Sequence, residues 1–168
     1  FGLATVFGLI SGCLVHTTLL AFGVSAIIKQ SENLFFTIKL FGAIYLLYLA
    51  FKVYQSDASI ILVKDNVDNK TTAQLFKQGF IMNVLNPKVS IFFLAFFPGF
   101  LFSDSISTVI QFYILGIIFM LVSLIIFSTI AILASVIAEK IKENKNIALY
   151  LKWTQIVVFV LIAVFILV

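Results

Sequence analysis

The sequence predicts an all-α integral membrane protein, and three observations support this fold class. Of its 168 residues, 62% are hydrophobic and only 11% are charged, with a mean hydropathy of +1.21. Soluble domains average about half apolar and about a quarter charged residues, so a bilayer is the better-matched solvent. The apolar residues form unbroken stretches, such as 109–138 and 156–168, without the strict alternation of a membrane β-barrel. Because backbone polar groups in lipid must be bonded within the protein, these stretches predict helices.

Five segments are long enough to cross the membrane, which takes about 20 residues in a helix. We expect these spans at residues 2–28, 34–54, 75–102, 108–138 and 149–168. Asn86-Pro87 interrupts the third span. Tyr150 and Trp153 open the fifth, where aromatic rings prefer the membrane interface. Residues 1–168 are therefore expected to form a single transmembrane domain.

Lysines are concentrated in two of the four segments that connect the spans. Residues 29–33 contain one lysine and residues 103–107 contain none, whereas residues 52–77 and 139–152 contain four each. The two lysine-rich segments are separated by two spans, so they fall on the same side of the membrane. Positive charge marks the cytoplasmic side.

This orientation places Phe1 on the cytoplasmic side, Val168 on the external side and residues 55–74 in a cytoplasmic loop. Lysine without arginine, with abundant Asn, Ile and Phe, is typical of an AT-rich bacterial genome, which predicts a bacterial inner membrane. The loop lysines account for the net charge of +4, so the expected partner is the lipid bilayer and not nucleic acid. Phe1 stands inside an apolar run without a basic leader, which predicts a fragment and not a signal peptide.

A weak internal repeat relates the two halves of the chain. Lys39 and Lys152 are each followed by an alanine eleven residues later. Spans one and two would then correspond to spans four and five, with residues 1–54 as the remainder of a first repeat and residues 75–168 as a second. Repeats of three spans are inverted relative to each other, which is a feature of secondary transporters.

Polar residues interrupt the third span at Asn83, Asn86, Pro87 and Lys88. Proline lacks a backbone donor and clashes with the preceding turn, so carbonyl groups near residues 83 and 84 are freed. Irregular backbone at membrane depth must be buried in protein or line a wet cavity. A lysine near mid-membrane indicates function by default. The alternative is a tilted or re-entrant segment from which Lys88 reaches the cytoplasmic surface.

The first span carries Gly8, Gly12 and His16 on one helix face. The small residues predict close helix packing. His16 has three possible roles: solute binding, proton relay, or a hydrogen bond to a neighbouring carbonyl. Cys13 is the only cysteine, which excludes an internal disulfide and a Cys-x-x-Cys pair, and no metal site is expected.

In the second span, Gly42 is assigned to helix packing, and the hydroxyl of Tyr45 is placed to reach a polar cavity. No predicted span contains Asp or Glu, which excludes a carboxylate proton carrier in this part of the chain. Nucleotide-binding and Gly-x-Ser-x-Gly motifs are also absent, so neither an enzyme nor a bound cofactor is expected.

The sequence from Gly79 to Lys88, GFIMNVLNPK, followed by FFLAFFP at 92–98, resembles the hallmark of the lysine exporter/homoserine-threonine resistance family of amino-acid exporters. Lys39 followed by GAIYLLYL at 42–49 is similar to the region that precedes this hallmark in members of that family. This resemblance implies a six-helix bundle with two inverted three-helix halves, of which the first helix is lacking here. In this arrangement Gly79 is assigned to helix packing.

The leading hypothesis is a secondary transporter that exports an amino acid or a related small solute from the cytoplasm. Asn83, Asn86 and the broken backbone at Pro87 would hold its ammonium or carboxylate group. Lys88 would attract the carboxylate, and the side chains lining the cavity would be His16 and Tyr45. The expected coupling ion is a proton, and the bundle is compatible with a homo-oligomer.

Two alternatives belong to the same superfamily or share a similar bundle. A metal-ion exporter of the cadmium type is disfavoured by the near absence of His, Cys and intramembrane carboxylates. A thiol-disulfide membrane electron carrier requires a cysteine pair, and Cys13 is alone. A purely structural membrane subunit is disfavoured by the intramembrane Asn-Pro-Lys sequence.

Overall fold

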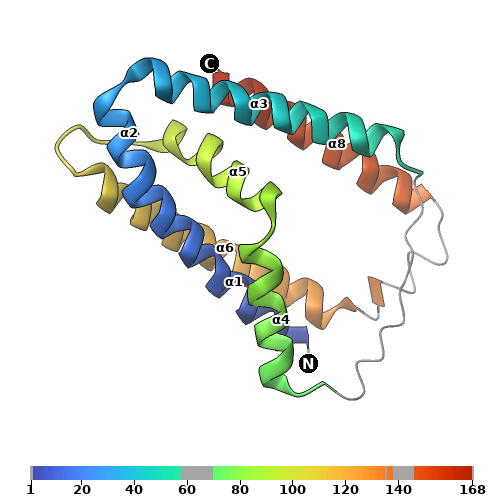
Figure 1. The fold of residues 1–168 in the computed structure, drawn as a ribbon. Coiled ribbons are helices and arrows are strands. Elements are labelled where there is room, and N and C mark those ends of the chain that lie inside the picture. The colour runs from blue at the N-terminus through green and yellow to red at the C-terminus, as the bar shows by residue number, and fades with distance from the viewer. Residues whose placement is uncertain (1, 58–69, 135, 138–145, 168) are drawn as a thin grey trace.

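The computed structural model describes residues 2–57, 70–134, 136–137 and 146–167. This part of the chain consists of helices joined by short turns, without a β-strand (Figure 1). In order, the elements are α1 (Gly2–Leu19), the π-helix η1 (Leu20–Val24), α2 (Ser25–Gln30), α3 (Glu32–Gln55), α4 (Thr72–Val84), α5 (Pro87–Phe96), the 3₁₀-helix η3 (Phe97–Phe100), α6 (Thr108–Ile132) and α8 (Asn146–Leu167).

The helices confirm the predicted fold class of an all-α membrane protein. Four helical stretches are long and apolar enough to cross a membrane, and they cover Gly2–Ile27, Asn33–Gln55, Thr108–Ile132 and Asn146–Leu167. The pair Thr72–Val84 and Pro87–Phe100, which is bent by 54°, is a fifth span if its two helices are counted as one. The bend falls where Asn86-Pro87 predicts it.

Side-chain caps explain where the helices begin. Ser31 accepts a hydrogen bond from the backbone N–H of Leu34 at the start of α3. Thr71 and Gln74 form a reciprocal capping box at the start of α4, with bonds of 2.8 and 3.3 Å. The box starts α4 at Thr72, a few residues before the predicted start of the third span, because it satisfies backbone donors that hydropathy does not register.

The fourth span is shorter than predicted. The helix α6 ends at Ile132, and Leu133 leaves helical geometry with φ of −88° and ψ of 6°. Hydropathy extended the predicted span to residue 138 because the residues after this bend are still apolar. Residue 135 and residues 138–145 lie outside the described part, as do Phe1, Val168 and the loop residues 58–69.

The helices form two groups that are joined by the broken span. One group contains α1 packed against α4 and α6, and the other contains the antiparallel pair α3 and α8, against which α5 packs (Figure 1). In Figure 1, α3 ends and α8 begins at the right-hand side, α6 ends at the lower right and α4 begins at the bottom, whereas α2–α3 and η3–α6 connect at the left. The helix ends that flank the two lysine-rich segments therefore lie toward the same end of the bundle.

Two apolar cores lie within this arrangement, and α5 contributes to both. The first lies between the first span, α5 with η3, and α6, and it contains Cys13, Leu20, Ala21, Val24, Phe93, Phe97 and Phe112. The second lies between α3, α5 and α8, and it contains Ala43, Leu46, Ala50, Ala95, Phe159, Ala163 and Ile166. Large apolar side chains also cover much of the outer surface, as expected of helices solvated by lipid.

Candidate functional site

The break in the third span lies partway along its length, with Asn83 buried, Asn86 and Lys88 half-buried, and Leu85 and Pro87 exposed. The helix α4 has 13 residues, so it rises about 20 Å before it ends at Val84. The helix α5 starts again at Pro87, which has the backbone geometry suited to the first position of a helix. Asn86 is its N-cap, and its Oδ1 accepts a hydrogen bond of 3.0 Å from the backbone N–H of Lys88.

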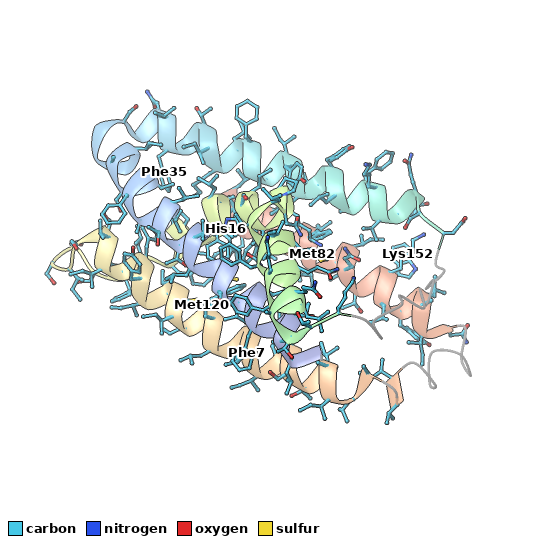
Figure 2. The ribbon with its side chains drawn as sticks, turned by 60° about the horizontal axis from the view of Figure 1, so that its bottom comes forward. Phe7, His16, Phe35, Met82, Met120 and Lys152 are labelled. Atoms are coloured by element: carbon cyan, nitrogen blue, oxygen red, sulfur yellow. The ribbon has the colours of Figure 1, made fainter. Side chains whose placement is uncertain are left out.

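The carbonyl oxygen of Asn83 is the group that the proline leaves without its regular helical partner. In an uninterrupted helix it would accept from the backbone nitrogen of residue 87, but proline carries no hydrogen there. Instead the backbone N–H of Asn86 donates to it over 3.0 Å. His16 Nε2 on α1 is its second donor, at 3.1 Å, because a carbonyl can only accept. Figure 2 shows His16 in the middle of the bundle, where α1 passes the broken span.

His16 thus takes the third of its predicted roles, a hydrogen bond to a neighbouring carbonyl. It is 4% exposed, and its ring lies 5.5 Å from that of Phe93 on α5. The imidazole therefore touches both halves of the broken span, α4 through Asn83 and α5 through Phe93.

The side chain of Asn83 points at α1. Its Nδ2 donates to the sulfur of Cys13 over 3.6 Å. Its Oδ1 is buried and has no hydrogen-bond partner among the described residues. A Cβ added at Gly12 would lie 2.7 Å from this oxygen, so the glycine makes room for the amide. Asn83 is 7% exposed, and a buried acceptor without a donor is costly.

Glycines bring α1 and α4 into backbone contact around this amide. A Cβ at Gly8 would collide with the backbone of Phe76, and one at Gly79 would collide with the backbone of Thr5. Small residues at three and four residue intervals allow such an approach within a membrane. The glycines of both helices thereby determine where Asn83 on α4 lies relative to His16 on α1.

Lys88 points to the other side of the break, toward α8. Its Nζ lies over the ring of Phe159, 4.3 Å from the ring centroid. Phe159 stands thirteen residues into α8, about 20 Å from the start of that helix, and is 6% exposed. The ammonium group of the half-buried Lys88 therefore lies beside the middle of α8 and away from the start of that helix.

Gly42 and Tyr45 lie on α3, which packs against α5 and α8. A Cβ at Gly42 would collide with the Cβ of Ala95 on α5. Tyr45 is half-buried, and its ring lies 6.2 Å from that of Tyr48. The predicted site residues thus fall in two places, His16 with Asn83 between α1 and α4, and Lys88 beside α3 and α8. Asn86-Pro87 connects the two.

A small cavity of about 90 Å³ lies beside His16. It is lined by His16, Leu19, Leu20, Ser90, Phe93 and Leu94. Ser90 was not predicted as a site residue, although it lies three residues after Pro87, one turn along α5. Its Oγ donates to the carbonyl oxygen of Asn86 over 3.3 Å. The volume has room for a few water molecules at about 30 Å³ each.

Two further features were not predicted. Gln111 is 1% exposed, and it closes the turn between η3 and α6: its Oε1 accepts from the backbone of Phe102 and Ser103, and its Nε2 donates to the carbonyls of Ser103 and Ile106. A glutamine in the first turn of an apolar span is the sequence feature from which a buried polar role of Gln111 could have been predicted. The π-helix Leu20–Val24 has no such signal in the sequence.

These contacts define a multi-pass helical membrane protein with a discontinuous span, an architecture typical of secondary transporters. Its polar groups at the break are one ammonium, one imidazole, two amides and a hydroxyl. Within the described residues, no group of three His, Cys, Asp or Glu side chains is placed to hold a metal ion.

The chain belongs to the family of LysE type translocators, whose family model matches residues 1–168. It is similar to the homoserine/homoserine lactone efflux protein of Salmonella typhi, with 30% identity over 143 residues, which are 85% of this chain and 68% of that protein. The protein of the same description from Salmonella typhimurium strain LT2 is 29% identical over the same shares of the two chains. No solved structure matches the chain significantly.

Proposed function

We propose that this protein exports a small neutral amino acid from the bacterial cytoplasm across the inner membrane. Membership of the translocator family supports transport, and relatives described as homoserine/homoserine lactone efflux proteins support this substrate class. The observation that carries the proposal is the broken span, which places the half-buried Lys88 and the Asn86 cap partway along the helices, beside the middle of α8.

The carboxylate of the amino acid binds at the start of α5. The start of a helix is the positive end of its dipole, which favours an anion. Lys88, the second residue of α5, adds an ammonium group at this same end. Half-helix N-termini bind substrate carboxylates in other transporters with discontinuous spans.

The ammonium group of the amino acid requires acceptors on the α1 side of the break. Asn83 Oδ1 is a buried acceptor that has no hydrogen-bond partner among the described residues. A donor that reaches Asn83 Oδ1 removes the desolvation cost of that oxygen. His16 and Ser90 line the cavity through which such a group would approach.

A neutral side chain follows from the distribution of charge. None of the seven acidic residues of the chain stands inside a predicted span. A substrate with a second positive charge would therefore meet Lys88 without a counter-charge. A hydroxyl-bearing side chain such as that of homoserine carries no such cost.

Export is coupled to protons in this proposal. His16 is the only histidine of the chain, it lies at the break, and histidine is the residue that most readily exchanges protons near neutral pH. The side on which the two lysine-rich segments emerge is cytoplasmic, by the positive-inside rule.

Export from cells loaded with dipeptides of homoserine and of other amino acids tests the proposal. Expression of the protein should accelerate release of the small neutral amino acid, and Asn86→Ala combined with Lys88→Ala should abolish the acceleration. Lys77→Ala is the matched control, because Lys77 is exposed on α4 outside the break. Undiminished export by the double variant would refute the site, and unchanged release on expression of the parent protein would refute the function.

A further inference from the structure

The side chain of Lys88 has an unusual set of neighbours for a half-buried cation. Its Nζ lies over the face of Phe159, and no carboxylate pairs with it among the described residues. The sequence places no Asp or Glu within α4, α5 or α8. The ring of Phe159 is therefore the group that stabilises the ammonium charge. Cation–π attraction is strongest where water is excluded.

The location of Lys88 in its own helix makes an attractive partner for its ammonium group more important. It stands in the first turn of α5, where the helix dipole is positive and a cation is disfavoured. Without an attractive partner the flexible side chain would turn away from the helix end toward a membrane surface. The aromatic face opposes that tendency and keeps the ammonium at the depth of the break.

Phe159 is itself held rigidly. It is 6% exposed and packs in the core of small residues formed by α3, α5 and α8, including Ala95 and Ala163. Gly42 allows α3 to approach α5 at Ala95, and this contact helps to close the core. A ring fixed in this way presents one face at a constant place, which a mobile aromatic side chain would not do.

We propose that Phe159 positions Lys88 for substrate, because its ring face holds the ammonium group at the start of α5, where the carboxylate of the exported amino acid arrives. The inference rests on the proposed role of Lys88 in binding that carboxylate. Phe159 is a positioning residue in this account. It acts on substrate through Lys88, so its alteration changes the half-saturating substrate concentration more than the maximal rate.

Stepwise fluorination of the ring separates the electrostatic contribution of Phe159 from its packing. Phenylalanine analogues with one, two and three fluorine atoms, placed at position 159 by amber suppression, reduce the negative potential of the ring face while they preserve its shape. Uptake into inverted vesicles should show a half-saturating concentration that rises with each fluorine, to roughly 3- to 30-fold for the trifluorinated ring. Phe159→Tyr should retain near-normal affinity, and Phe159→Leu should resemble the trifluorinated form.

Phe165 provides the matched control on the same helix. Its ring contacts the rings of Phe96 and Phe100, with no cation over it among the described residues. Fluorination at position 165 should leave the half-saturating concentration unchanged. In a Lys88→Met background, fluorination at position 159 should also have no further effect, because the two changes act through one contact.

The outcomes distinguish the inference from the proposed function. A graded rise at position 159 that is lost in Lys88→Met supports the inference. If Lys88→Met impairs export but fluorination at 159 leaves the affinity unchanged, the inference fails and the proposed function stands. If every analogue at 159 lowers the maximal rate equally, Phe159 is a packing residue only and the inference fails. Normal export by Lys88→Met overturns the inference together with the carboxylate site proposed at Lys88, while the export function stands.

Discussion

The two halves of the broken span are held by different kinds of contact. The helix α4 contacts α1 backbone to backbone. The glycines on both helices allow this approach, which leaves no room even for a methyl group at their positions. The helix α5 meets α3 and α8 through side chains, with Gly42 against the Cβ of Ala95 and Lys88 against the ring of Phe159. The first contact is therefore rigid, whereas the second contains groups that can repack.

This difference suggests how the break is used. His16 and Asn83 are fixed by the rigid contact, which makes the α1 side a constant reference for a bound solute. Lys88 belongs to the side-chain contact, where its ammonium group lies over the ring of Phe159. Discontinuous spans in transporters permit one bundle to move against the other around the bound solute.

Substitution of a backbone-contact glycine should have the largest effect on stability. Gly79→Leu forces α4 away from the backbone of Thr5, and we expect a loss of at least about 3 kcal/mol or failure to accumulate in the membrane. Fluorescence-detected size exclusion after heating measures the change. Gly23→Ala is the control, because a Cβ there meets no atom within 4 Å, and it should change stability by less than about 1 kcal/mol.

A rescue experiment separates the backbone contact from the side-chain contact. Gly42→Ala should cost about 1–3 kcal/mol, and the second substitution Ala95→Gly should recover most of this loss, because the collision is with the Cβ of Ala95. Gly8→Ala should cost at least as much and should not respond to Ala95→Gly, since its collision is with the backbone of Phe76. Equal responses of the two variants would erase the proposed distinction.

Removal of the imidazole should have a moderate effect. His16→Ala leaves the carbonyl of Asn83 with the N–H of Asn86 as its remaining donor, and we expect a loss of about 1–3 kcal/mol. His16→Gln places an amide N–H near the position of Nε2 and should restore part of the stability. Thermal unfolding in detergent compares the variants. Equal stabilities of the Ala and Gln variants would show that the hydrogen bond contributes nothing.

Loss of the α5 cap should have the smallest effect. Asn86→Ala removes the acceptor for the N–H of Lys88 and should cost about 1 kcal/mol, whereas Asn86→Ser keeps a capping oxygen and should be near neutral. The same thermal measurement applies. A loss in Asn86→Ser as large as in Asn86→Ala would assign Asn86 a structural role beyond the cap.

The sequence was sufficient for the fold class and for the place of the break, because hydropathy reports burial in lipid and Pro87 has a strong local effect. It also brought attention to His16, Asn83 and Lys88. Their division between two sides of the break was not predictable, because it depends on which helices pack together. The partners of Gln111 and the ring under Lys88 were missed for the same reason.

The correspondence between the two halves of the chain, with residues 1–54 and 75–168 as inverted repeats, stays a prediction. Its basis is the matched spacing after Lys39 and Lys152. The structure does show that Lys152 has a local role, since its Nζ donates to the carbonyl of Ser56 over 2.7 Å and lies over the ring of Tyr54. Figure 2 shows Lys152 near the end of the bundle, where α3 ends.

Substrate protection of a thiol at the break tests the central claim, that the exported amino acid binds there, most directly. In a Cys13→Ser background, Ser90→Cys places a near-isosteric thiol in the cavity beside His16. A small thiol reagent applied to inverted vesicles should label this cysteine, and homoserine should slow the labelling, whereas the amino alcohol that lacks the carboxylate should not. Labelling at the same rate with and without homoserine, in vesicles that still transport it, would contradict the account.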